Sequence, residues 1–173
     1  MVKIGNTVVY RDEICTVADI LEKYKDDEDY YVLSSVHDAS LHIKVSVRRA
    51  AEVMRPLITK AEIKALISKI PDIKTLPAST WNRGLEYKEL LHDGSLESIV
   101  CIIKTVHLRQ QEKVDNKQKP SDSDKMYFRQ AEKLFYNEVA ASLGVGYDEA
   151  KAYITQEVAA LGDGGVGAGQ KRR

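Results

Sequence analysis

The pattern of apolar and polar positions changes once along the chain, close to Pro56. Before that point, β-branched or alternating apolar residues form four short runs, at residues 7–10, 14–20, 30–33 and 41–45. Polar stretches separate the runs, and the charged stretch 23–29 (KYKDDED) predicts a hairpin loop. Short antiparallel strands joined by polar turns predict a small β-barrel over residues 1–58.

Beyond this point the apolar residues recur at helical spacing and predict about five helices within residues 59–161. Thr59 and Glu62 have the spacing of a capping box at the start of the first helix, and Pro71 ends that helix. The glycine-rich stretch 162–173 predicts a disordered tail. A small antiparallel barrel followed by an all-α domain is an α+β fold.

The single tryptophan, Trp81, falls at the predicted start of the second helix, among small polar residues. Ser79 or Thr80 is expected to cap this helix, residues 93–94 (Asp-Gly) to end it, and Ser95 to cap the next one. Because tryptophan normally lies in a core, this position leaves two interpretations open. The side chain is either displayed for binding or folded back as a local lid on the helical core.

The remaining helices are predicted at residues 124–143 and 148–161, with a solvated polar loop over residues 110–124. The third helix, which begins after Ser95, carries a broad apolar stripe. Glycines 144 and 146 separate the last two helices.

Composition restricts the classes of function. The chain has 173 residues, with 26 Lys/Arg and 26 Asp/Glu, so its formal net charge is zero. Residues 1–58 carry 8 Lys/Arg against 10 Asp/Glu, which argues against independent binding of DNA phosphates by this part. No apolar run is long enough to span a membrane, and the N-terminus lacks the apolar core of a signal peptide. Two cysteines without a zinc-type or CxxC spacing predict reduced thiols, so we expect a cytoplasmic protein without a metal or cofactor.

Candidate catalytic residues are few. His37 and Asp38 are adjacent in the predicted turn SSVHDAS, but neighbouring residues on a strand face opposite ways and no oxyanion-type glycine turn accompanies them. An aspartate at a turn position explains the segment better than catalysis does. We therefore do not expect an enzyme, and we keep a His37–Asp38 hydrolase as the least favoured alternative.

The last predicted strand offers a different surface. His42 and Lys44 share its polar face, and Arg48 follows the strand. Such a strand could add to the sheet edge of another protein, with backbone hydrogen bonds giving affinity and side chains giving selection. An ordinary charged edge that prevents aggregation is the alternative.

The sequence resembles the CarD/CdnL family of bacterial transcription regulators over about residues 2–160. The resemblance rests on KIGNTVVYRDEICTVADI, YYVL, LHIKVSVRRAAEVMRPLI, TWNRGLEYKELLHDGSLESIVCIIKTVHLR and AEKLFYNEVAASLGVGYDEA, in that order. The motifs that carry it are G-x-x-V-V-Y at the start, W-x-R at a helix start, D-G-S-L-E between two helices and A-x-x-L-x-x-E-V-A late in the chain.

The resemblance implies an N-terminal Tudor-like (SH3-like) domain that binds the β subunit of RNA polymerase, with Lys44 on the contacting strand. We add His42 and Arg48 to this predicted contact, because they lie on or follow the same strand. It also implies a helical domain that touches promoter DNA at the upstream edge of the transcription bubble. Trp81 would act there as a wedge in the minor groove, and Arg83 and Lys88 would neutralise phosphates. The expected regulator is a monomer that reaches the nucleoid through polymerase.

The sequence also departs from the family pattern. Gly84 stands where a second basic residue is common, and Glu86 dilutes the basic character of the next turn, which leaves Lys88. Ser46 replaces a frequent proline after the polymerase-contacting strand, and Arg11 replaces one in the first turn. These changes keep open a second function from another class, a protein–protein adaptor whose helical domain never touches DNA.

Overall fold

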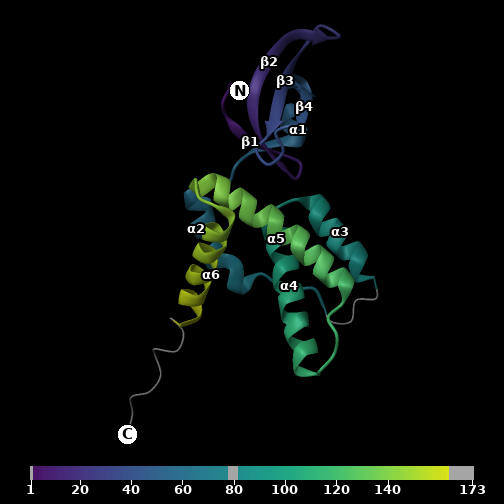
Figure 1. The fold of residues 1–173 in the computed structure, drawn as a ribbon, viewed down its shortest axis with the longest axis vertical. Coiled ribbons are helices and arrows are strands. Elements are labelled where there is room, and N and C mark those ends of the chain that lie inside the picture. Colours follow the sequence, from purple (N-terminus) through teal and green to yellow (C-terminus); the bar gives the residue numbers. More distant parts are fainter. Residues whose placement is uncertain (1, 78–81, 164–173) are drawn as a thin grey trace. The chain divides into compact units, whose positions relative to one another are not determined.

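The computed structural model of the protein describes residues 2–77 and 82–163. Contacts divide the chain into two compact units, Met1–Leu57 and Ile58–Arg173. The first is built on an antiparallel sheet and the second on helices, so the predicted α+β class is confirmed (Figure 1). Within the described ranges, no helix combines the length and the apolar character that crossing a membrane requires.

The sheet of the first unit has five antiparallel strands in the order β4-β3-β2-β1-β5. Its strands are β1 (Thr7–Tyr10), β2 (Glu13–Lys25), β3 (Glu28–Ser35), β4 (His42–Ser46) and β5 (Met54–Pro56). The four strands predicted from apolar runs correspond to β1 to β4. The strands form an open sheet with β4 and β5 at its two ends, and closure into a barrel stays a prediction.

The core of this unit lies on one face of the sheet. Val17 pairs with Leu33, and Tyr31 pairs with Val45, so these side chains point to the same side. The buried cluster on that side consists of Val8, Cys15, Val17, Tyr31, Leu33, Val45 and Ala50. A register shift between Val17 and Asp19 changes the alternation of β2. The opposite face of β4 carries His42 and Lys44.

The charged stretch 23–29 is mostly strand, so the prediction of a hairpin loop there was too long. β2 and β3 run through it to a tight turn at Asp26 and Asp27, whose φ angles are both positive, 53° and 57°. Two central residues with positive φ are typical of the two-residue turns that match strand twist. Lys23 and Asp29 add a side-chain tie across the hairpin, since the Asp29 carboxylate accepts the Lys23 N–H at 2.9 Å.

The stretch between β4 and β5 differs from the prediction of strands throughout residues 1–58. Residues Val47–Val53 form a short helix, α1, and β5 then pairs with β1. Ala50 of α1 joins the core of the sheet. A seven-residue helix is too short to show a clear helical period, which explains why the pattern did not reveal it.

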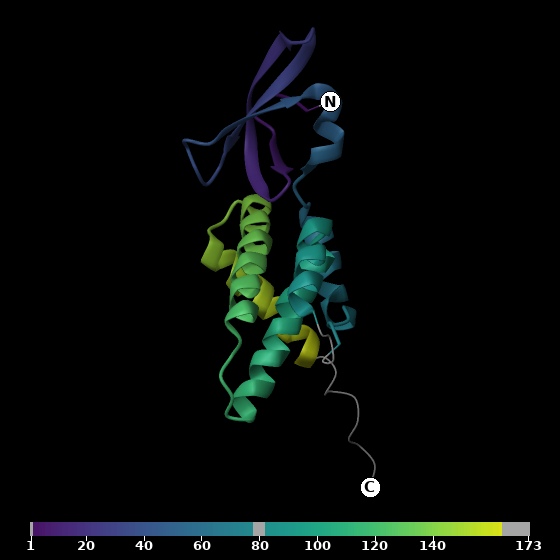
Figure 2. The same cartoon turned by 90° about the vertical axis from the view of Figure 1, so that its right-hand side faces the viewer.

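The second unit contains five α-helices in its described part, in agreement with the expected number. They are α2 (Lys60–Lys69), α3 (Arg83–Asp93), α4 (Leu96–Asp115), α5 (Asp122–Leu143) and α6 (Tyr147–Asp163), with a 3-10 turn η1 (Ile70–Asp72) after α2. Figure 2 shows α4 and α5 as adjacent helices joined by a short loop. That loop is shorter than the predicted polar segment 110–124, because α4 continues to Asp115.

Several helix ends form as their residues predict. Thr59 and Glu62 make both hydrogen bonds of a capping box at the start of α2. The Ser95 side chain accepts the Ser98 N–H at the start of α4, and Gly94 ends α3 in the left-handed conformation. Gly144 ends α5 in the same way.

Two predicted boundaries were wrong. The N-cap of α3 is Asn82 rather than Ser79 or Thr80, so Trp81 precedes the helix. α6 extends through residues 162 and 163, which were assigned to the disordered tail. The rest of that tail, 164–173, lies outside the described residues, and so do residues 78–81 with Trp81.

The helical core joins all five helices. Its largest fully buried side chains include Ile63, Tyr87, Ile99, Ile102 and Phe135. Ile73 and Leu76, from the connector between α2 and α3, pack against this core. The connector is therefore part of the packed unit up to the point where residues 78–81 begin.

Candidate functional site

The predicted polymerase-contacting side chains lie on and beside the end strand β4. His42 and Lys44 both project from the face opposite the core and are exposed. His42 Nδ1 lies 2.9 Å from the Ser34 hydroxyl on the neighbouring strand β3. The structure thus places His42 and Lys44 side by side on one surface, each in contact with a different strand of the β2–β3 hairpin.

Lys44 contacts an aromatic side chain that was not among the predicted site residues. Its ammonium donates a hydrogen bond to the Tyr24 hydroxyl at 2.7 Å and lies 4.2 Å from the centre of the Tyr24 ring. Hydrogen bonding by Lys44, supported by its charge, lowers the pKa of Tyr24. Tyr24 in turn packs edge-on against Tyr30, with ring centres 5.5 Å apart. These contacts hold the Lys44 side chain against the hairpin that β2 and β3 form.

Arg48 belongs to the same end of the sheet through Glu28. The Arg48 guanidinium lies 2.8 Å from one Glu28 oxygen, and the Ser46 hydroxyl donates to the other oxygen at 2.7 Å. Glu28 is the first residue of β3, so it ties α1 to the hairpin. Sequence reasoning missed Tyr24 and Glu28 because both lie in the charged stretch that was predicted as a loop. Their partners become visible only once strand register is known.

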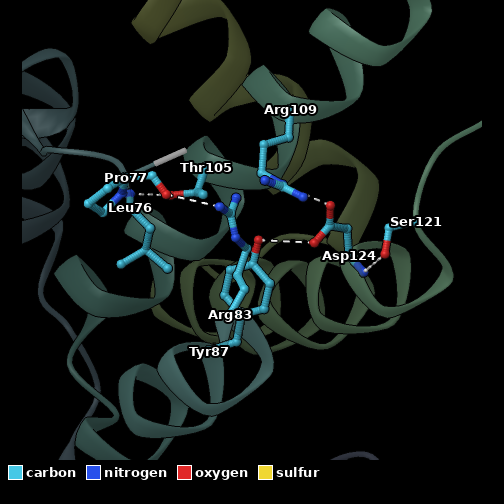
Figure 3. Close-up of polar contacts among 8 residues, drawn as sticks. All are labelled: Leu76, Pro77, Arg83, Tyr87, Thr105, Arg109, Ser121 and Asp124. Carbon is cyan, nitrogen blue, oxygen red and sulfur yellow. Dashed lines mark hydrogen bonds and ion pairs between the residues drawn. The ribbon is translucent and has the colours of Figure 1, made fainter. Parts of the chain in front are cut away.

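In the second unit, polar contacts fix the chain on both sides of residues 78–81. On the N-terminal side, the Leu76 N–H donates to the buried Thr105 hydroxyl of α4 at 3.0 Å. On the C-terminal side, the Arg83 guanidinium donates to the Pro77 carbonyl oxygen at 2.9 Å (Figure 3). Arg83 was predicted as a phosphate contact. The structure shows it half-buried, with one N–H directed to the backbone just before the tryptophan segment.

The first turns of α3 are anchored by a buried ionic network. The Tyr87 hydroxyl donates to Asp124 at 3.2 Å, and the Arg109 guanidinium donates to the other oxygen of the same carboxylate at 2.9 Å (Figure 3). Asp124 is 3% exposed and Tyr87 is completely buried. Burial, reinforced by the negative charge of Asp124, raises the pKa of Tyr87 to about 12. The network links α3, α4 and α5, since it uses one residue from each helix.

Three further positions on α3 concern the predicted DNA contact. Lys88, the other predicted phosphate contact, is exposed. A side chain at Gly84 would begin 4.0 Å from the Tyr127 hydroxyl, an ordinary packing distance, so the backbone accepts other residues there. Glu86 is half-buried. Burial raises the pKa of the Cys101 thiol on α4, and the charge of Glu86 adds to this shift.

The residues considered for catalysis have structural partners. Asp38 accepts hydrogen bonds from the Ser40 N–H at 2.9 Å and from the Ser40 hydroxyl at 2.6 Å, and these bonds lower its pKa. The N–H groups of His37 and Asp38 both donate to the Ser35 hydroxyl. This is the side-chain bonding of a turn-forming aspartate. Cys15 and Cys101 are free thiols, and no group of three potential metal ligands occurs in the part of the chain that the structure describes.

The comparison with protein families and curated proteins found no match. The chain matches no protein-family model, and no curated protein matches it.

Proposed function

We propose that this protein is a regulator of transcription initiation that binds the β subunit of bacterial RNA polymerase and stabilises the open promoter complex. The first unit has a Tudor-like fold, and the free edge of its open sheet at β4 tethers the chain to polymerase. The second unit contacts promoter DNA at the upstream edge of the bubble, with Trp81 as the wedge. The proposal rests on the sequence resemblance and on the local geometry around two surfaces, and it requires no enzymatic activity.

The end strand β4 supports the tether. Because β4 is the last strand of the sheet order, its outer backbone edge can receive a strand from a partner. His42, Lys44 and Arg48 lie on or just after β4, and the charges of Lys44 and Arg48 suit an acidic or polar partner. The contacts of Lys44 with Tyr24 and of Arg48 with Glu28 restrict both side chains before binding, which lowers the entropy cost of an interface.

The observation that carries the DNA contact is the bracketing of residues 78–81. Leu76 is bonded to α4 and Pro77 to Arg83, so the chain enters and leaves this segment at defined points. Because the backbone is held on both sides of this segment, inserting Trp81 at an unstacked base step would cost less conformational entropy. The zero net charge of the chain fits a protein that depends on polymerase for its local concentration at the promoter.

The tether is tested by the binding of the full-length protein to purified bacterial RNA polymerase, measured by biolayer interferometry. Lys44→Glu should abolish binding. Lys23→Glu makes the same charge change at a lysine on β2 whose side chain is 75% exposed, and it should bind like the wild type. Equal binding of both variants, or no binding by the wild type at high micromolar concentration, would refute the tether.

A protein–protein adaptor is the second candidate, and exposed apolar side chains favour it. Leu85 on α3 is 50% exposed and Met126 on α5 is 55% exposed, and Leu108 and Val114 on α4 are also exposed. If these side chains formed one contiguous patch, it would be typical of a protein contact. Footprinting of the polymerase–promoter complex distinguishes the two functions. Added protection of DNA upstream of the bubble supports the regulator, and an unchanged footprint supports the adaptor.

A further inference from the structure

Strand β2 contains an irregular segment whose role the function proposed above does not include. Its pairing with β3 shifts between Leu21 and Lys25, so residues 22–24 of β2 lie opposite Asp29 alone. Extra residues of this kind form a bulge, which bends the strand and redirects its side chains. Tyr24 belongs to this bulge.

The bulge is built on an unusual backbone conformation at Lys23. The φ angle of Lys23 is 47°, in the left-handed region that residues with a Cβ atom rarely adopt. Asp29 ties this residue across the hairpin, since its carboxylate accepts the Lys23 N–H at 2.9 Å. Such a conformation costs free energy that regular strand pairing would not, so its presence suggests a function for the residues that it positions.

The residue that follows, Tyr24, contacts Lys44 of β4, although β3 lies between the two strands in the sheet. The Lys44 ammonium donates a hydrogen bond to the Tyr24 hydroxyl at 2.7 Å, and it lies 4.2 Å from the centre of the Tyr24 ring. Tyr30 of β3 packs edge-on against that ring, with ring centres 5.5 Å apart. The bulge therefore directs one aromatic side chain across the sheet to the end strand.

This contact leaves the charge of Lys44 available to a partner. An ammonium has three N–H donors, and the Tyr24 hydroxyl takes one of them. Within the described ranges, Lys44 forms no ion pair and no second hydrogen bond, and its side chain is exposed. A cation–π contact holds a positive charge in place without neutralising it.

We propose that Tyr24 is the positioning residue for Lys44 in the tether to polymerase, and that the bulge at Lys23 serves to direct Tyr24 onto it. Ring and hydroxyl together hold the ammonium on the outer face of the sheet, where it meets an acidic side chain of the partner. The inference rests on the proposed function, because it assigns Tyr24 a role in that contact. The contact itself can be tested on the free protein.

The free protein tests the contact through the ionisation of Tyr24. Hydrogen bonding by Lys44 and its charge lower the pKa of Tyr24, and Lys25 adds a smaller effect. Lys44→Met should therefore raise this pKa more than the matched control Lys25→Met does. Asp29→Ala should raise it relative to Asp29→Asn, which keeps an acceptor for the Lys23 N–H. An NMR titration of isotope-labelled tyrosine, with Tyr24→Phe to assign the signal, measures the pKa.

Binding of the full-length protein to purified polymerase tests the positioning role. Tyr24→Leu should weaken binding roughly threefold, as expected for the loss of an exposed cation–π contact, and Tyr24→Phe, which keeps the ring, should weaken it less. Neither change should have an effect in the Lys44→Met background, because Tyr24 acts only through Lys44. Damage to the sheet would act in both backgrounds and would lower Tm.

The pH profile of binding supplies a readout that a merely structural role would not move. As the pH rises toward 10, Tyr24 loses its proton and the phenolate neutralises the charge of Lys44. The wild type should therefore lose affinity relative to Tyr24→Phe. Lys25 and Tyr30, the other titratable groups beside Tyr24, are present in both proteins and cancel in this comparison.

The outcomes separate this inference from the proposed function. If the wild type binds polymerase but Tyr24→Leu binds as well or more tightly, the positioning role is refuted and the tether stands. Equal losses from Tyr24→Leu with Lys44 and with Lys44→Met, or parallel pH profiles of wild type and Tyr24→Phe, would refute it too. An equal Tyr24 pKa in wild type and Lys44→Met would refute the contact itself. If the wild type does not bind, the tether and the role of Tyr24 in it both fail, whatever the NMR titration shows.

Discussion

The Arg83 guanidinium donates a hydrogen bond to the Pro77 carbonyl oxygen across 2.9 Å, and the two residues lie on either side of the segment that holds Trp81. A residue expected to neutralise phosphate therefore also constrains the backbone beside the proposed wedge. Direct phosphate binding and backbone positioning make different demands on the side chain, because a charge alone serves the first and a planar donor of the right length serves the second.

Substitution of Arg83 separates these two demands. Arg83→Lys keeps the charge on a shorter, non-planar group, whereas Arg83→Gln removes the charge. We expect both variants to shorten the open-complex lifetime roughly fivefold, a loss of about 1 kcal/mol, because both disturb the bond to Pro77. A lifetime with Arg83→Lys equal to the wild type, measured by competitor challenge of preformed complexes, would show that charge alone matters.

Position 84 allows a gain of function. The space near the Tyr127 hydroxyl accepts a Cβ atom, and α3 is already helical at this position. Gly84→Lys restores a basic residue and should steepen the salt dependence of promoter binding by about 0.9 in log–log slope, as expected for one added phosphate contact.

Gly84→Ala is the matched control for this change. Alanine also favours the helix over glycine, but it adds no charge, so it should leave the salt slope unchanged. Equal slopes for the two variants, measured by fluorescence anisotropy of the polymerase–promoter complex, would contradict a DNA contact by this face of α3.

The ionic network of Asp124 predicts a large loss of stability. Asp124→Ala leaves the guanidinium of Arg109 without its buried partner and the Tyr87 hydroxyl without an acceptor. We expect the free energy of unfolding to fall by about 3 kcal/mol in urea titrations. Asp122→Ala removes a fully exposed carboxylate in the same helical turn, and it should lower the stability far less. Comparable losses in the two variants would contradict the network.

The pKa of Tyr87 predicts a dependence of stability on alkaline pH. Its folded-state pKa of about 12 lies above the ordinary value of 10.0, so the folded protein holds this proton more tightly than the unfolded chain. The contribution is fully present below pH 10 and is lost as the pH rises toward 12. Chemical denaturation at several pH values up to 11 should show a falling free energy of unfolding.

Tyr87→Phe isolates this contribution from other groups that titrate in the same range, such as the buried Cys15 thiol with a pKa of about 11. The difference in unfolding free energy between wild type and Tyr87→Phe should shrink as the pH rises above 10. A difference that stays constant across the range would contradict the raised pKa.

Local signals in the sequence predicted many of the structural details. Thr59 and Glu62 form the capping box that their spacing implies, and Gly94 ends α3 where the Asp-Gly pair was expected to do so. Gly5 before β1 has a positive φ angle of 86°, a conformation that glycine adopts without steric cost. These features depend on a few adjacent residues, so the sequence contains the information that determines them.

The wrong predictions concern elements whose structure depends on contacts between residues far apart in the sequence. Residues 23–25 and 28–29 are strand because β2 and β3 pair beyond their apolar part, although their charges predicted a loop. Helix α1 is stabilised by packing Ala50 on the sheet. No pattern predicted the hydrogen bonds of Lys104, since their acceptors are carbonyl groups more than thirty residues away in the sequence. α3 begins at Arg83, and no side-chain hydrogen bond caps it at Asn82, so a search for capping residues could not locate this start.

The proposed function depends most directly on Trp81. The decisive measurement is the lifetime of open promoter complexes formed by bacterial RNA polymerase with saturating wild-type protein, Trp81→Ala or Trp81→Phe, with polymerase binding of each measured in parallel. The wild type should lengthen the lifetime, Trp81→Phe should retain part of the effect, and Trp81→Ala should lose it while binding polymerase as before. Equal lifetimes with wild type and Trp81→Ala would contradict the wedge and the proposed stabilisation of the open complex.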